Sequence, residues 1–97
     1  MEINIPLKYQ NDVETAVKLL KEEGCDSVFL FGSLVTGDFN EESDIDLGVT
    51  GLCPRKYIRT CCKLDKVIIN DYDLVDFDEN IEMFNFLCSI NEVIKIG

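Results

Sequence analysis

Apolar residues recur at helical spacing in the first part of the chain. Intervals of one, three and four residues place side chains on one face of a helix. The residues with this spacing are Val13, Ala16, Val17, Leu19 and Leu20. This pattern predicts a helix over residues 12–23, with Asn11 just before it and Glu14 in position for a capping box. Gly24 suits the residue that follows such a helix, because glycine adopts the left-handed conformation without strain.

Two short segments in the first half of the chain are typical of β-strands. Residues 27–31 form an apolar run of strand-forming residues, bounded by glycine on both sides. In residues 44–49 polar and apolar residues alternate, so Asp44 and Asp46 point to one face and the apolar side chains to the other. We expect a loop over residues 32–43 between these strands.

The second half of the chain predicts two further helices and two further strands. Pro54 suits the first turn of a helix, whose end stays open because residues 67–69 fit an extended segment equally well. Residues 72–77 alternate like a strand and residues 80–90 look helical. Residues 93–96 fit a terminal strand.

The order of these elements, α-β-β-α-β-α with a terminal strand, predicts an α/β (α+β) fold in which helices pack against a small mixed sheet. At 97 residues the chain fits one compact domain over residues 1–97 and is too short for two. A domain of this size buries a limited core, so self-association stays an open alternative. We assign four aromatic residues to that core, namely Phe29, Phe31, Phe84 and Phe86.

Charge is the most unusual property of the composition. The 19 acidic and 9 basic residues give a formal net charge of −10. This argues against nucleic-acid binding, because neutralising phosphates needs clustered lysine and arginine. Five cysteines without CxxC spacing and no histidine argue against a zinc site. The sequence shows neither a signal segment nor an apolar run that could span a bilayer, so we expect a cytoplasmic protein with reduced thiols.

Candidate chemistry is concentrated around the first two predicted strands. Gly32 lets the backbone turn tightly and approach a ligand. Ser33 would open a short helical turn, whose free amides and hydroxyl suit phosphate oxygens. Asp44 and Asp46 project side by side, so their charges repel each other unless a cation lies between them. Taken alone, the Gly-Ser pair also fits an ordinary turn, and the two aspartates fit a solvated strand face.

The full run from Gly32 to Leu47, GSLVTGDFNEESDIDL, resembles the signature of the DNA polymerase β-like nucleotidyltransferase superfamily. In that superfamily the Gly-Ser and Asp-x-Asp pairs are joined by a third carboxylate on a later strand, and the matching residue here is Asp73. The short length, the first helix and the ending NEVIKI resemble the minimal nucleotidyltransferase branch. The resemblance therefore covers essentially the whole chain.

This resemblance implies an enzyme that transfers a nucleoside monophosphate, with ATP as donor, to a hydroxyl group. It implies two magnesium ions held by Asp44 and Asp46, one of them also by Asp73, while Gly32 and Ser33 hold the β and γ phosphates. Minimal nucleotidyltransferases are often paired, as antitoxins, with a small helical HEPN-type toxin. Some add AMP to a tyrosine of that partner.

Three alternatives stay open. Related transferases often carry Ala-Arg-Gly before the acidic loop, whereas this chain has Thr36 in place of the arginine. A catalytically weak or inactive antitoxin-like module, which neutralises a basic partner by complex formation, is therefore the second hypothesis. A small-molecule transferase is disfavoured, because the chain lacks a second domain to hold the substrate. Other acids compete with Asp73 for the third carboxylate, namely Asp71, Asp76 and Asp78.

Overall fold

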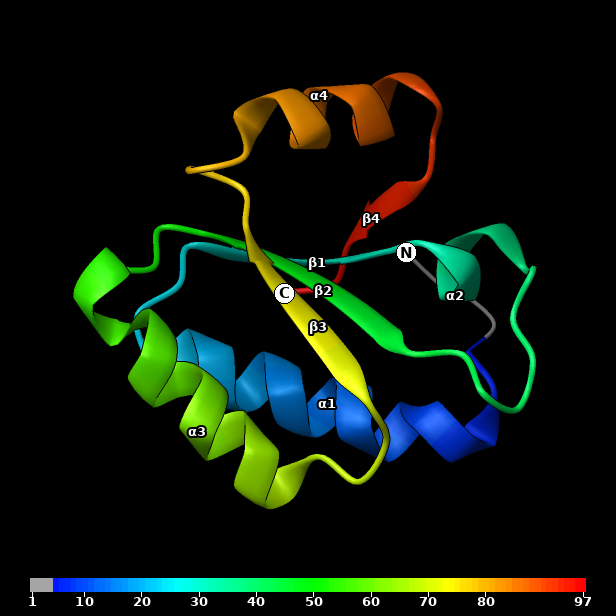
Figure 1. Cartoon of the computed structure of the whole chain (residues 1–97), viewed down its shortest axis with the longest axis horizontal. Coiled ribbons are helices and arrows are strands. Elements are labelled where there is room, and N and C mark those ends of the chain that lie inside the picture. Colours follow the sequence, from blue (N-terminus) through cyan, green and yellow to red (C-terminus); the bar gives the residue numbers. More distant parts are fainter. Residues whose placement is uncertain (1–4) are drawn as a thin grey trace.

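The computed structural model describes residues 5–97, and the elements within them follow the predicted α+β order (Figure 1). Their bounds are α1 (Leu7–Glu22), β1 (Ser27–Phe31), α2 (Ser33–Thr36), β2 (Ile45–Thr50), the 3-10 helix η1 (Pro54–Lys56), α3 (Tyr57–Val67), β3 (Tyr72–Asp76), α4 (Ile81–Ser89) and β4 (Val93–Lys95). The predicted fold class is confirmed, because helices pack against a small mixed sheet. No helix in this described part is long and apolar enough to cross a lipid bilayer.

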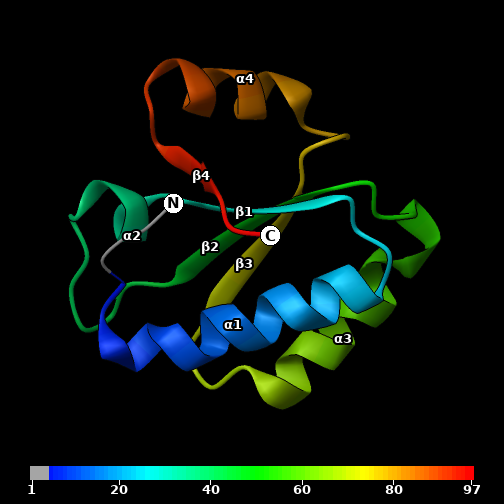
Figure 2. The same cartoon turned by 180° about the vertical axis from the view of Figure 1, so that it is seen from behind.

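The sheet is mixed, and its strand order differs from the order along the chain. The strands lie in the order β3-β2-β1-β4, with β1 antiparallel to both neighbours and β2 parallel to β3. The parallel pair is connected through η1 and α3, and α3 lies beside α1 on one face of the sheet (Figure 1). Figure 2 shows α4 on the opposite side. The second face is therefore covered only in part.

The main core fills the space between the sheet and the two longer helices. The side chains buried there come from α1, β1, β2 and α3, and include Val13, Ala16, Leu20, Val28, Leu30, Ile45, Leu47, Val49 and Leu64. Burying one such side chain stabilises a fold by about 1.5–3 kcal/mol. The alternation in β2 therefore decides which face of that strand meets the helices, and Asp46 points to the other face.

A smaller aromatic cluster lies on the other face of the sheet, under α4. The cluster contains Phe29, Phe31, Phe77 and Phe84, and the ring centroids of its contacting pairs lie 4.9 to 5.7 Å apart. Gly48 leaves the room for this packing, because a Cβ at that position would lie 2.0 Å from Cε2 of Phe77. Helix α4 adds Leu87 to the cluster. Aromatic packing thus fills one end of this face.

The start of α1 corrects the sequence-based expectation. The helix begins at Leu7, after Pro6, and no side chain caps its first turn. Asn11 and Glu14 lie inside the helix, so the predicted capping box is wrong. The first turn has one exposed leucine, Leu7, and one buried aromatic residue, Tyr9, and this pattern was too short to predict where the helix begins. At the other end the prediction is confirmed, because Gly24 follows the helix with a φ of +99°.

One further expectation is confirmed and one needs correction. The loop predicted over residues 32–43 begins with the one-turn helix α2 (Ser33–Thr36), as expected for a short helical turn that opens at Ser33. The assignment of Phe86 to the core is wrong, since its side chain is 61% exposed. Phe84 and Leu87 occupy the inner side of α4 instead. In so short a helix a few apolar residues do not define a buried face.

Candidate active site

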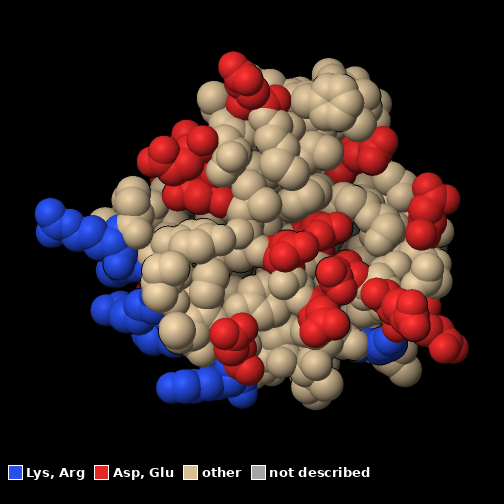
Figure 3. All heavy atoms as spheres, viewed as in Figure 1, with Lys and Arg blue, Asp and Glu red and all other residues tan. Residues whose placement is uncertain are grey.

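The parallel pairing of β2 and β3 brings two acidic residues side by side. Asp46 lies opposite Asp73 in the register, and the next pair is Leu47 with Leu74. Side chains alternate along strands, so the two leucines enter the core while the two aspartates share the face turned away from α1 and α3. In the space-filling view, acidic side chains gather in the middle of the molecule and basic ones along the edge formed by η1 and α3 (Figure 3).

The row of residues across the sheet continues beyond these two acids. Phe31 of β1 pairs with Asp46, and Val93 of β4 pairs with Phe31. We call Asp44, Asp46 and Asp73 the acidic row, with Asp44 as the exposed residue directly before β2. The acidic row thus borders the aromatic cluster on the same face of the sheet.

Asp46 is the electrostatically strained member of the acidic row. Its side chain is half-buried, and burial raises the pKa of its carboxyl to about 6, with the charges of Asp73 and Asp44 acting in the same direction. Burial penalises a charged group, and like charges nearby disfavour ionisation. A cation beside Asp46 would relieve both effects. The arrangement is therefore suited to a bound metal ion.

Gly32 lies directly against the carboxylate of Asp46. Its φ is +78°, and a Cβ there would lie 2.2 Å from Oδ2 of Asp46, so a larger residue is excluded by both conformation and space. Gly32 is the N-cap of α2, and its carbonyl accepts the amides of Val35 and Thr36. Ser33, the first residue of α2, is half-buried. The first amides of a helix have no acceptor within it, so this turn offers free donors next to Gly32, which itself lies against Asp46.

The structure thus brings Gly32, Ser33, Asp46 and Asp73 together, with Asp44 at the start of the same strand. Of the competing acids, Asp71 precedes β3, and Asp76 has its side chain buried on the opposite face, where it accepts the amide of Asp78. Across residues 5–97, no three Asp, Glu, Cys or His side chains form a complete metal site. Any ion here would need ligands from a substrate as well.

Tyr9 of α1 fixes the backbone that leads into β2. Its side chain is 1% exposed, and its hydroxyl donates to the carbonyl oxygens of Ser43 at 2.9 Å and Asn40 at 3.2 Å. Ser43 immediately precedes Asp44. The acidic loop before the row is therefore tied to a buried residue of the first helix.

Asp12, one helical turn further along α1, fixes the backbone that leads into β3. Its carboxylate is 2% exposed and accepts the backbone amides of Ile69 and Asn70 and the side-chain amide of Asn70, at 2.8 to 3.1 Å. The next carbonyl, that of Asp71, accepts the amide of Ile45 at the start of β2. Asp12 therefore helps to set β3 in register with β2, and with it Asp73 beside Asp46.

Sequence reasoning missed both residues of α1. A signal was present, because Tyr9 and Asp12 continue the buried face formed by Val13, Ala16 and Leu20. An acidic residue on the apolar face of a helix is rarely buried unless it has partners. Its partners were not predictable, because they lie far along the chain.

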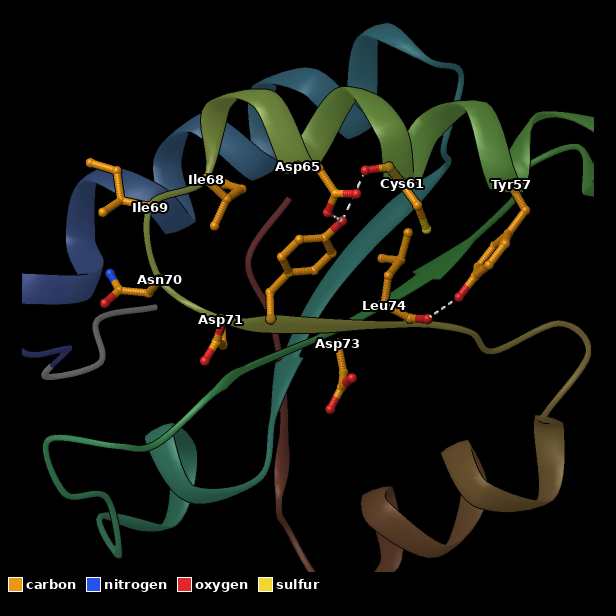
Figure 4. A pocket seen from close by; sticks show the side chains of 10 residues that line it. Tyr57, Cys61, Asp65, Ile68, Ile69, Asn70, Asp71, Asp73 and Leu74 are labelled. Atoms are coloured by element: carbon orange, nitrogen blue, oxygen red, sulfur yellow. Dashed lines mark hydrogen bonds between the residues drawn. The ribbon is translucent and has the colours of Figure 1, made fainter.

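An open groove of about 730 Å³ runs along the outer edge of β3, between this strand and α3 (Figure 4). Leu74 points toward α3, whereas Asp71 and Asp73 point away from it (Figure 4). The hydroxyl of Tyr57 donates to the carbonyl of Leu74, and that of Tyr72 donates to Asp65. These contacts attach the edge strand that carries Asp73 to the helix behind it.

Comparisons with known proteins place the chain in a family. The family model for polymerase beta nucleotidyltransferases matches residues 14–95. A crystal structure of a toxin-antitoxin with AMP-PNP is 30% identical, with a TM-score of 0.55 over 71% of this chain and 57% of the other. This chain therefore spans less than two thirds of that protein chain. A proposed nucleotidyltransferase from Sulfolobus solfataricus is 20% identical over 84% of this chain and 85% of its own, with a TM-score of 0.43. Curated proteins give no significant match.

Proposed function

The chain belongs to the polymerase beta nucleotidyltransferase family, and on this basis we propose that it transfers AMP from ATP to a hydroxyl group, which loses its proton while pyrophosphate leaves. The observation that carries the proposal is the pairing of Asp46 with Asp73 on parallel strands, with Gly32 against the Asp46 carboxylate. Two adjacent carboxylates beside a glycine turn suit a metal ion together with a phosphate chain. No single one of these residues would carry the argument.

Magnesium is the ion that these residues fit best. It prefers oxygen ligands and is usually held by one or two carboxylates plus substrate phosphates, so a site that is incomplete without substrate is expected. Asp44 and Asp46 would hold two ions, and Asp73 would hold the ion on the acceptor side. Bound there, magnesium would lower the pKa of the acceptor hydroxyl and offset negative charge at the transferred phosphate.

The residues of the chain have separate tasks in this proposal. Gly32 and Ser33 bind the β and γ phosphates through backbone amides and the serine hydroxyl, which orients the triphosphate. Asp46 gains from cation binding, because burial and the neighbouring carboxylates penalise its charge in the free protein. The aromatic cluster supports the row from one side and limits the access of water there. We place the reaction in the cytoplasm, where the free thiols of all five cysteines stay reduced.

For the acceptor we propose a tyrosine hydroxyl of a small helical HEPN-type toxin. The support is the similarity to a toxin-antitoxin that was crystallised with a nucleotide analogue. Because this chain spans only part of that relative, both the partner and the acceptor are proposals for this chain.

Intact-mass analysis tests the proposal most directly. The chain is incubated with ATP and magnesium, with and without the product of the neighbouring gene, and the intact mass of each protein is measured. We expect a gain of one AMP on the partner, lost in Asp44→Asn, Asp46→Asn and Asp73→Asn and kept in Asp71→Asn, whose side chain lies outside the acidic row. Transfer that persists in all three row variants would exclude this mechanism.

A second candidate, a module that neutralises its partner by binding alone, is favoured by one observation. Helix α2 carries no basic residue, and Thr36 makes only local contacts with Ser33 and Asp38. Positive charge for the phosphates would then have to come from metal ions alone. If the partner is bound and inhibited by Asp46→Asn as strongly as by the natural chain, neutralisation without transfer is the function.

A further inference from the structure

Helix α4 carries apolar side chains on the face that the fold leaves uncovered. Four of them are 38 to 61% exposed, and these are Ile81, Met83, Phe86 and Ile90. Met83, Phe86 and Ile90 are spaced by three and four residues, so they form one stripe along the helix. We call these four residues the α4 stripe. A helix that is apolar on both its inner and outer sides is normally buried.

The inner side of α4 already has a task. Phe84 and Leu87 pack on the aromatic cluster, and after the helix the chain turns at Asn91 with a φ of 56° and enters β4. Val93 of β4 stands in the same cross-strand row as Asp46 and Asp73. The α4 stripe and the acidic row therefore belong to one side of the sheet, on which α4 stands alone (Figures 1 and 2).

The charges around the α4 stripe are mainly negative. Residues 67–94 contain no lysine or arginine, and Lys95 of β4, which stands opposite Phe29, is the first basic residue after them. The charged residues of this segment are Asp71, Asp73, Asp76, Asp78, Glu79, Glu82 and Glu92. A hollow of about 450 Å³ at the start of α4 is lined by Glu79, Asn80, Ile81, Glu82 and Met83. Two carboxylates next to two apolar side chains suit an aliphatic stem that ends in a cation, as in lysine or arginine.

From these observations we propose that the α4 stripe is the docking surface for a partner protein with an apolar patch bordered by lysine and arginine. The occupant is not a second copy of this chain, because pairing α4 with itself would bring Glu79, Glu82 and Glu92 of each copy against equal charges. A basic partner instead meets opposite charge around an apolar centre, as protein interfaces commonly do. Phe86, the most exposed of the four side chains, is the expected anchor.

Docking at this place has a consequence for the acidic row. A protein seated on α4 borders the side of the sheet that carries Asp46 and Asp73, so its own surface is held beside the proposed reaction site. In this respect the inference rests on the proposed function, because it makes the bound partner also the source of the acceptor hydroxyl. Holding the two reactants together is a large part of what such an enzyme contributes.

Photochemical cross-linking identifies the occupant. Benzoylphenylalanine replaces Phe86 in the full chain, expressed in cells of the source organism, and in a matched control it replaces Leu7, which is 83% exposed on α1. We expect one protein to be joined to position 86 and not to position 7. That protein, once purified, should bind Phe86→Glu at least about 30-fold more weakly than the natural chain and bind Leu7→Glu unchanged. Its affinity should also fall as salt is added.

Four results would overturn the proposal: no cross-link from position 86, a cross-link to a second copy of the chain, a partner whose affinity is unaffected by Phe86→Glu, or a partner that gains AMP equally from Phe86→Glu. The outcome for transfer is separate, because Phe86→Glu leaves the acidic row intact and ATP with magnesium should still raise its Tm. A partner that binds α4 and gains no AMP supports docking and refutes transfer to it. A partner that gains AMP equally from Phe86→Glu supports transfer and refutes docking.

Discussion

Gly32 is the residue whose replacement should disturb the acidic row most directly. In Gly32→Ala the positive φ is strained and the new Cβ meets Oδ2 of Asp46, whereas Gly37→Ala has the same kind of φ with nothing within 4 Å. We expect Gly37→Ala to lower the free energy of unfolding by about 1 kcal/mol. For Gly32→Ala we expect about 2 kcal/mol more, from overpacking against the carboxylate. Urea denaturation of both variants measures this difference, and equal losses would show that Asp46 simply moves aside.

Asp46 should make the stability of the protein depend on pH in a specific direction. Its pKa rises from 3.8 to about 6 on folding, so the folded state holds this proton at pH values where the unfolded state has lost it. The contribution of Asp46 to the free energy of unfolding is therefore favourable below pH 4, is lost as the pH rises from about 4 to about 6, and stays lost at pH 7. Asp46→Asn should be more stable than the natural chain at pH 7 by about 1–2 kcal/mol.

The matched variant for this effect is Asp73→Asn. It keeps the burial of Asp46 but removes one of the two charges that raise its pKa, so its stability at pH 7 should lie between those of the natural chain and Asp46→Asn. Thermal unfolding in metal-free buffer at pH 4, 5, 6 and 7 would measure the series. A constant difference between Asp46→Asn and the natural chain over this range would contradict the assignment.

Among the elements, α1 does more than cover the sheet, because its carboxylate at Asp12 holds the turn between α3 and β3. Asp12→Ala leaves the amides of Ile69 and Asn70 without their acceptor, and we expect it to lower the free energy of unfolding by about 3 kcal/mol. Glu14→Ala, an exposed position on the same helix, should change it by less than about 0.5 kcal/mol. Chemical denaturation compares the two, and a small effect of Asp12→Ala would mean that the turn finds other partners.

Elements with a strong local pattern were predictable, and their partners were not. The alternation in β2 and β3 placed Asp46 and Asp73 on the faces away from their apolar neighbours, as the structure has them. The structure pairs β3 with β2 in parallel and places β4 beside β1. These pairings depend on contacts between distant segments, and the spacing of apolar residues along the chain does not predict such contacts. The same holds for Tyr9, whose acceptors in the acidic loop are more than thirty residues away. The local pattern was therefore enough to assign side chains to the two faces of each strand, whereas the assembly of the site depends on tertiary contacts.

The molecule as a whole carries a formal net charge of −10, and its stability should respond to ions in two separable ways. Sodium chloride should raise the Tm, because it screens repulsion among the carboxylates. Magnesium with AMP-PNP at equal ionic strength should raise it further, since a ligand that binds only the folded state stabilises it, by about 2.7 kcal/mol at one hundred times its Kd.

Differential scanning fluorimetry measures both shifts. The additional shift should disappear in Asp46→Asn and persist in Asp71→Asn, which removes the same charge from outside the acidic row. Both variants should retain the effect of sodium chloride. If magnesium and AMP-PNP add nothing beyond ionic strength in the natural chain, only the neutralising module described above would stand.

Helix α1 holds the backbone just before β2 and just before β3, and this limits how the site can be reused in protein engineering. A designer who copied β1, β2 and β3 into another scaffold would carry over the acidic residues and the glycine turn, but not Tyr9 and Asp12, which hold the backbone before Asp44 and Asp73. In such a graft the two carboxylates would be present without a fixed separation. The smallest portable unit of this site therefore includes the first two turns of α1, although no residue of that helix belongs to the acidic row.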